Sequence, residues 1–221
     1  MEVTTSQRLA PRRFGRIAGA VAIATCALAL VLTGTADAKK NRYVGAKKCK
    51  KCHDGKDKGD QHAVWKKMKH ANAYKVLASA DAKKVGKKHG VANPQKDAKC
   101  LKCHETAFGE GKKNLARSFK PKLGVQCESC HGAGEKHFKV RFREEQEREE
   151  EGGGWDDDGG GDILAELPPG ELDKVSEKMC KKCHNKDSPT FKDFDYKKRC
   201  EEVSHLDPRH GKKRLKKPCA K

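Results

Sequence analysis

The chain has 221 residues, a formal net charge of +19, 37% charged residues, 5% aromatic residues and a mean hydropathy of −0.94. This polar composition excludes a large conventional core of apolar side chains. Either much of the chain lacks a fixed fold, or a group other than amino acids fills its interior. The length allows one or two domains.

Residues 1–38 have the pattern of a signal peptide for export. Four arginines precede an 18-residue apolar run at residues 17–34, and small residues at Ala36–Ala38 offer a cleavage site. An uncleaved membrane anchor is the alternative, because 18 apolar residues can just span a bilayer. The sequence therefore predicts an exported protein, located in the periplasm, whose folded part is residues 39–221.

Four cysteine pairs recur along the remaining chain, each with two residues between the cysteines and a histidine directly after the second. They are Cys49, Cys52 and His53; Cys100, Cys103 and His104; Cys127, Cys130 and His131; and Cys180, Cys183 and His184. This is the attachment pattern of c-type haem, in which the thiols hold the porphyrin and the histidine binds its iron. Zinc ribbons and thioredoxin-like redox pairs do not require that histidine. The sequence therefore predicts four covalently attached haem c groups.

Four haems would supply the missing apolar interior, because each porphyrin is a large flat apolar body. The predicted fold is mainly α with much irregular structure, a compact multihaem cytochrome c fold organised around four covalently bound haems. The best helix candidate is residues 61–80, where Val64, Met68 and Ala71 follow the helical period. No stretch alternates convincingly enough to predict a sheet.

Each iron also needs a sixth ligand or an open position. Beyond residue 38 the methionines are Met68 and Met179, and Met179 directly precedes Cys180, where it is poorly placed to reach over the same haem. Ligation by two histidines is therefore expected, which gives lower potentials than histidine with methionine. The histidines outside the motifs are His62, His70, His89, His137, His205 and His210.

Three segments carry a family resemblance: YVGAKKCKKCH at residues 43–53, WKKMKHANA at residues 65–73 and CESCHGAG at residues 127–134. With them the chain resembles the tetrahaem cytochrome c-554 family of bacterial multihaem electron carriers. The resemblance implies that His70 is a distal ligand of a haem other than the first, and that His137 is the distal ligand of the first haem. A histidine after the fourth motif, His205 or else His210, would be a third distal ligand.

The same resemblance implies that the second haem, held by Cys100, Cys103 and His104, is five-coordinate. Two histidines leave this open, because His89 or His62 could close the site. Either histidine could instead simply face solvent.

Two further features concern the C-terminal half. Residues 144–162 hold ten acidic residues, one arginine and two glycine runs, which predicts a flexible acidic insertion. Cys200 and Cys219 lie outside the haem motifs and are expected to form a disulfide in an oxidising compartment.

The function that these patterns predict is transfer of single electrons between other redox proteins, with no reaction catalysed by the chain itself. The basic surface would steer partners that have acidic docking surfaces, whereas export argues against nucleic acid and a membrane association would need an uncleaved signal segment. One alternative is a haem enzyme whose open second haem acts on a small nitrogen oxide or on hydroxylamine. Another is a subunit of an extracellular haem wire. The donor, the acceptor, the potentials and the oligomeric state are not predicted.

Overall fold

The computed structural model describes residues 40–56, 59–151 and 171–205. The chain divides into two units, residues 1–39 and residues 40–221, and every described residue belongs to the second. The predicted signal peptide thus lies outside the described residues. None of the helices in the described ranges is long and apolar enough to cross a membrane.

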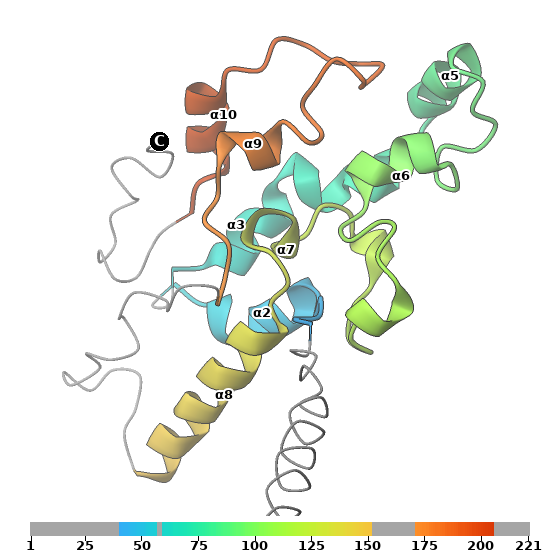
Figure 1. The fold of residues 1–221 in the computed structure, drawn as a ribbon. Coiled ribbons are helices and arrows are strands. Elements are labelled where there is room, and N and C mark those ends of the chain that lie inside the picture. Colours follow the sequence, from blue (N-terminus) through green and yellow to red (C-terminus); the bar gives the residue numbers. More distant parts are fainter. Residues whose placement is uncertain (1–39, 57–58, 152–170, 206–221) are drawn as a thin grey trace, which may run out of the picture. The chain divides into compact units, whose positions relative to one another are not determined.

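The described part is mainly helical, with irregular connections between short helices (Figure 1). Its α-helices are α2 (Ala46–His53), α3 (Gln61–Lys67), α4 (Ala73–Val76), α5 (Ala80–Lys88), α6 (Ala98–His104), α7 (Glu128–His131), α8 (Glu135–Glu150), α9 (Glu177–Cys180) and α10 (Tyr196–Val203). The 3₁₀ turns are η2 (Lys69–Asn72), η3 (Lys112–Asn114) and η4 (Pro121–Leu123). The only β pairing within the described ranges is an isolated parallel bridge between Tyr43 and Leu115. The predicted class, mainly α with much irregular structure, is confirmed for these residues.

The single helix expected over residues 61–80 is wrong, because the chain breaks at Met68. Met68 is extended, with φ −75° and ψ 155°, between α3 and η2. The break frees the backbone carbonyl of His70, which accepts a hydrogen bond from the Val125 amide at 3.0 Å. A tertiary contact has therefore overridden the helical period of the sequence.

Residues 144–150, the first part of the predicted flexible insertion, instead form the last turns of α8. Glutamate, glutamine and arginine favour helix, and Arg141 forms an ion pair with Glu144 at 2.8 Å, one turn apart. Glu145 also accepts a hydrogen bond from the Cys52 thiol at 3.2 Å, which fastens this stretch to α2. Residues 152–162 lie outside the described residues.

Two polar side chains, Glu128 and Gln126, organise the centre of the described part. The Glu128 carboxylate is 4% exposed and accepts hydrogen bonds from the amides of Val44, Gly45 and Gly134 at 2.7–2.8 Å. Gln126 is 1% exposed, and its Oε1 accepts from the Ala46 amide at 2.9 Å. These oxygens take up amides at the start of α2 that the helix itself leaves unpaired.

The carboxyl of Glu128 titrates in an unusual setting. Burial raises its pKa above the usual range, while the three backbone N–H donors act in the opposite direction. Few apolar side chains are buried in the described part, among them Val44, Leu101 and Phe119.

We expect Glu128→Ala to lower the free energy of unfolding by about 3 kcal/mol or more, since each buried donor left without an acceptor costs roughly 1–3 kcal/mol. Urea unfolding of the purified protein measures the loss. The matched control is Glu177→Ala, which removes only an exposed ion pair with Lys181. The control should change the free energy by about 1 kcal/mol at most. Equal losses in the two variants would contradict the role assigned to Glu128.

Candidate cofactor site

Three of the four cysteine–histidine motifs lie on short helices, and the fourth begins at the end of one. The first three helices, α2, α6 and α7, all end at the histidine of their motif. The fourth motif begins at the end of α9 and continues into a turn, where the amide of His184 bonds to the Cys180 carbonyl at 3.0 Å. A helical turn brings the two cysteines and the histidine of a motif close together, as attachment to a single cofactor requires.

Three motif histidines face a histidine from outside the motifs. The ring centroids of His53 and His137 are 6.1 Å apart, with 20° between the ring planes. His184 faces His70 at 6.0 Å and 84°. His131 faces His205 at 6.0 Å and 41°.

This spacing fits one iron atom between two imidazoles. A metal–nitrogen bond is about 2 Å long, and an imidazole centroid lies about 1 Å behind its nitrogen, so two axial ligands place their centroids roughly 6 Å apart. The donor set therefore fits a haem iron held by two histidines at three of the four motifs.

The environment of His131 favours the neutral imidazole that an iron needs. Burial, followed by the nearby imidazoles of His205, His53 and His137, lowers the pKa of His131 to about 4. Burial likewise lowers the pKa of His70, and His184 adds to that shift. A neutral imidazole has a free nitrogen lone pair, whereas a protonated one has none.

The second motif differs from the other three. No histidine ring faces His104 among the described residues, and its Nδ1 lies 2.6 Å from the carbonyl oxygen of Ala73. His62 lies against Trp65, with ring centroids 5.4 Å apart, and 3.6 Å from the Asp54 carboxylate. His89 is exposed. No ring contact joins His62 or His89 to His104 in the part of the chain that the structure describes, and His210 lies outside it.

One of the segments that carried the family resemblance, residues 65–73, contacts the chain just before the third motif. Trp65 donates from Nε1 to the carbonyl of Val125 at 2.8 Å, and the amide of Val125 donates to the His70 carbonyl at 3.0 Å. Val125 lies two residues before Cys127. The tryptophan-to-histidine segment is therefore fixed to the chain that leads into the third motif.

The motifs also meet one another through their cysteines. The pKa of the Cys103 thiol is lowered to about 7, first by its contact with Cys183. The pKa of Cys49 is raised, first by its contact with Cys127 and then by burial. The first motif thus adjoins the third and the second adjoins the fourth, and Figure 1 shows α7 between α2 and α9.

The comparison with protein families agrees with this arrangement. The family model described as cytochrome c554 and c-prime matches residues 48–132. Residues 48–132 are therefore similar to the cytochrome c554 family. The similarity supports covalently bound haem c and a role in electron transfer, and the matched region contains the first three motifs. No curated protein and no solved structure matches the chain significantly.

The match ends before several of the residues that the resemblance pointed to. The fourth motif, together with His137 and His205, lies beyond residue 132. The number of four haems and the distal ligands therefore rest on the sequence motifs and on the ring geometry, not on the family comparison.

Sequence reasoning missed the residues that support the candidate ligands. Glu128 stands inside the third motif, yet its carboxylate contacts the first motif's helix rather than any ligand. Glu171 is 3% exposed and lies 2.7 Å from Nδ1 of His137, and no sequence pattern pointed to it.

Cys200 is buried and disulfide-bonded. Its expected partner Cys219 lies outside the described residues, so that pairing stays a prediction.

Gly124→Ala should separate the His70 segment from the third motif. Gly124 has φ +79°, and an added Cβ would lie 2.8 Å from the His70 carbonyl oxygen and 3.1 Å from that of Ala71. We expect a loss of about 3 kcal/mol in the free energy of unfolding from the clash and the backbone strain together. Urea unfolding measures it.

Gly109→Ala is the matched control, because Gly109 has φ +84° and no atom lies within 4 Å of the added Cβ. It reports backbone strain without the clash, so its loss should be clearly smaller. If both variants lose the same free energy, the contact between residue 124 and the His70 segment does not stabilise the protein.

Proposed function

We propose that this chain is an exported electron carrier that holds four haem c groups within residues 39–221, three of them between pairs of histidines. The three ring pairs at 6.0–6.1 Å carry the proposal, because each combines a motif histidine with one from elsewhere in the chain. When bound, each haem supplies a one-electron ferric–ferrous couple. The chain's residues bind and orient the group and exclude water from it.

The proposed axial pairs assign one distal histidine to each of three motifs. His137 serves the first motif, His205 the third and His70 the fourth. All three distal histidines belong to the same chain as their partners, so ligation at these sites needs no neighbouring subunit. This supports a self-contained carrier over a haem wire.

The paired motifs support electron transfer through the protein. Cys49 adjoins Cys127, and Cys103 adjoins Cys183, so attachment points from different motifs lie side by side. Burial together with the neighbouring thiolates of Cys180 and Cys127 raises the pKa of Cys130 to about 11, which places the fourth motif beside the third as well. Haems attached at these points would form one connected group.

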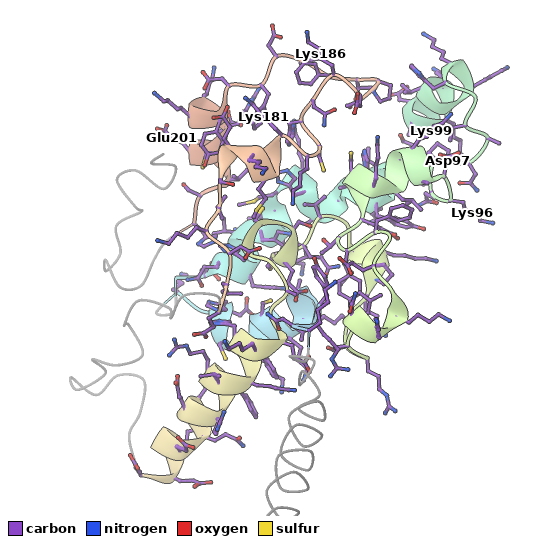
Figure 2. The ribbon with its side chains drawn as sticks, viewed as in Figure 1. Lys96, Asp97, Lys99, Lys181, Lys186 and Glu201 are labelled. Carbon is purple, nitrogen blue, oxygen red and sulfur yellow. The ribbon has the colours of Figure 1, made fainter. Side chains whose placement is uncertain are left out.

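Exposed lysines mark where partners would dock. The residues between the paired cysteines include exposed lysines in three motifs: Lys50, Lys51, Lys102, Lys181 and Lys182. Figure 2 labels further lysines on the same helices and their flanks, with Lys99 on α6 and Lys186 after α9. In the third motif the corresponding positions hold buried Glu128 and half-buried Ser129. We therefore place acidic redox partners at the first, second and fourth motifs, and not at the third.

Export is part of the same proposal. Haem c is attached outside the cytoplasm, and the first 38 residues have the pattern of a signal peptide. The periplasm is the proposed location, with the membrane relevant only if the signal segment remains attached.

Counting haems tests the proposal directly. Mass spectrometry of the secreted protein should show four added tetrapyrroles. The double variant Cys180→Ser, Cys183→Ser should carry three, because serine cannot form the thioether links of the fourth motif. The control Cys200→Ser alters a cysteine outside the motifs and should still carry four. A secreted wild-type protein with no tetrapyrrole mass would refute the proposal.

A second function is favoured by one observation, the absence of a histidine ring facing His104 in the described part of the chain. An iron held there could bind a small nitrogen oxide or hydroxylamine. The chain would then be an enzyme at its second motif and a carrier at the other three.

Ligand binding separates the two functions. If the second motif is open, the ferric protein should show one high-spin haem, and the reduced protein should bind about one carbon monoxide per four haems, as seen by absorption. Four low-spin haems and no carbon monoxide adduct would leave the carrier alone. In that event His89→Ala and His62→Ala identify a closing ligand, since only the variant that loses it gains carbon monoxide binding.

A further inference from the structure

Glu171 is a buried carboxylate attached to one of the candidate iron ligands. It is 3% exposed, and its Oε1 lies 2.7 Å from Nδ1 of His137. Arg141 reaches the same carboxylate with both Nε and Nη2 at 3.2 Å. The carboxylate therefore joins His137 and Arg141, which stand one turn apart on α8.

This contact fixes which nitrogen of His137 carries the hydrogen. An ionised carboxylate can only accept, so Nδ1 must donate and Nε2 is left with its lone pair. The His137 ring faces the His53 ring at 6.1 Å, across the space where an iron would lie. The tautomer that Glu171 selects is thus the one able to bind iron through Nε2.

The chemical nature of the acceptor distinguishes His137 from His104. Nδ1 of His104 lies 2.6 Å from a neutral backbone carbonyl, that of Ala73. A buried carboxylate is a stronger acceptor than a carbonyl and draws the hydrogen further from the ring, which makes the opposite nitrogen more basic. A more basic ligand stabilises ferric iron more than ferrous iron.

Arg141 supplies the positive charge opposite this carboxylate. A buried charge without a partner is costly, and the guanidinium supplies two hydrogen bonds and the opposite charge. Arg141 also bonds from Nη1 to the exposed Glu144 at 2.8 Å. The arginine is therefore shared between an exposed glutamate, which does not contact His137, and a buried one, which does.

We propose that Glu171 is a positioning residue that fixes the tautomer of His137 and lowers the reduction potential of the haem at the first motif. This inference rests on the proposed function, since it needs a haem between His53 and His137. Reduction of that haem adds one electron to the iron, and the hydrogen stays on Nδ1. The first haem would then be reduced less readily than the same haem with a neutral acceptor at residue 171.

The test is Glu171→Gln in the secreted, haem-loaded protein. Glutamine keeps the shape and an accepting oxygen but removes the charge. We expect the potential of one haem to rise, with about a tenfold change in its ferric–ferrous equilibrium, or about 59 mV for one electron. A redox titration followed by electron paramagnetic resonance measures each low-spin haem separately.

The ring planes identify the haem that should move. Nearly parallel imidazoles, as in His53 and His137 at 20°, split the iron orbitals they both interact with and give a rhombic signal. Nearly perpendicular ones, as in His70 and His184 at 84°, leave those orbitals close in energy and give one strongly shifted signal. The shift should fall on the most rhombic signal, that of the 20° pair, and not on the signal of His131 and His205 at 41°.

Glu144→Gln is the matched control. It makes the same chemical change at the other acceptor of Arg141, at a side chain 45% exposed, and should leave the rhombic signal's potential unchanged. Glu171→Asp retains the charge on a shorter side chain and should give a smaller rise.

The outcomes separate this inference from the proposed function. Wild-type protein without haem refutes both. Glu171→Gln protein with four haems and unaltered potentials overturns only the inference, as does an equal shift in Glu144→Gln. Should Glu171→Gln fail to fold, an unchanged rhombic potential in Glu171→Asp overturns it instead.

Discussion

The described structure depends on two buried polar side chains that cap a helix from outside it. Glu128 and Gln126 supply the oxygens for the amides at the start of α2, and both come from the third motif or its approach. The first and third motifs are thereby held together before any cofactor is considered. Such hydrogen bonds are strong when buried, since no water competes for the donors. A chain with few apolar side chains can in this way fix its backbone around a space that haem would fill.

The break at Met68 has a similar consequence for the fourth motif. A continuous helix over residues 61–80 would have bound the carbonyl of His70 within itself. The break leaves that carbonyl to the Val125 amide, and the ring of His70 then faces His184. One irregular residue thus links the approach to the third motif with a ligand position at the fourth. The close fit at Gly124, where no Cβ has room, belongs to the same contact.

Local electrostatics distinguish the motifs from one another. Lysines between the cysteines face solvent at the first and fourth motifs and in part at the second, whereas the third turns its glutamate inward. The acceptors for the ligand histidines differ too, a carboxylate at His137 and a backbone carbonyl at His104. Axial partners, their hydrogen bonds and surface charge are the means by which a protein adjusts otherwise identical haems. Haems attached at these motifs would therefore be unequal.

The sequence by itself determined the chemistry of attachment, because Cys-x-x-Cys-His is a local pattern that a single helical turn brings together, and it determined the mainly helical class. It also pointed to His70, His137 and His205, on the basis of family resemblance. Only the tertiary structure decided which histidine faces which. It also decided that the helix breaks at Met68 and that residues 144–150 continue α8. Glu128 and Glu171 likewise make their contacts with segments far from their own in the sequence. These depend on contacts between residues far apart in the chain, for which neither helical period nor motif spacing carries a signal. His137 and Glu171 are separated by 34 positions, and only folding brings them within 2.7 Å.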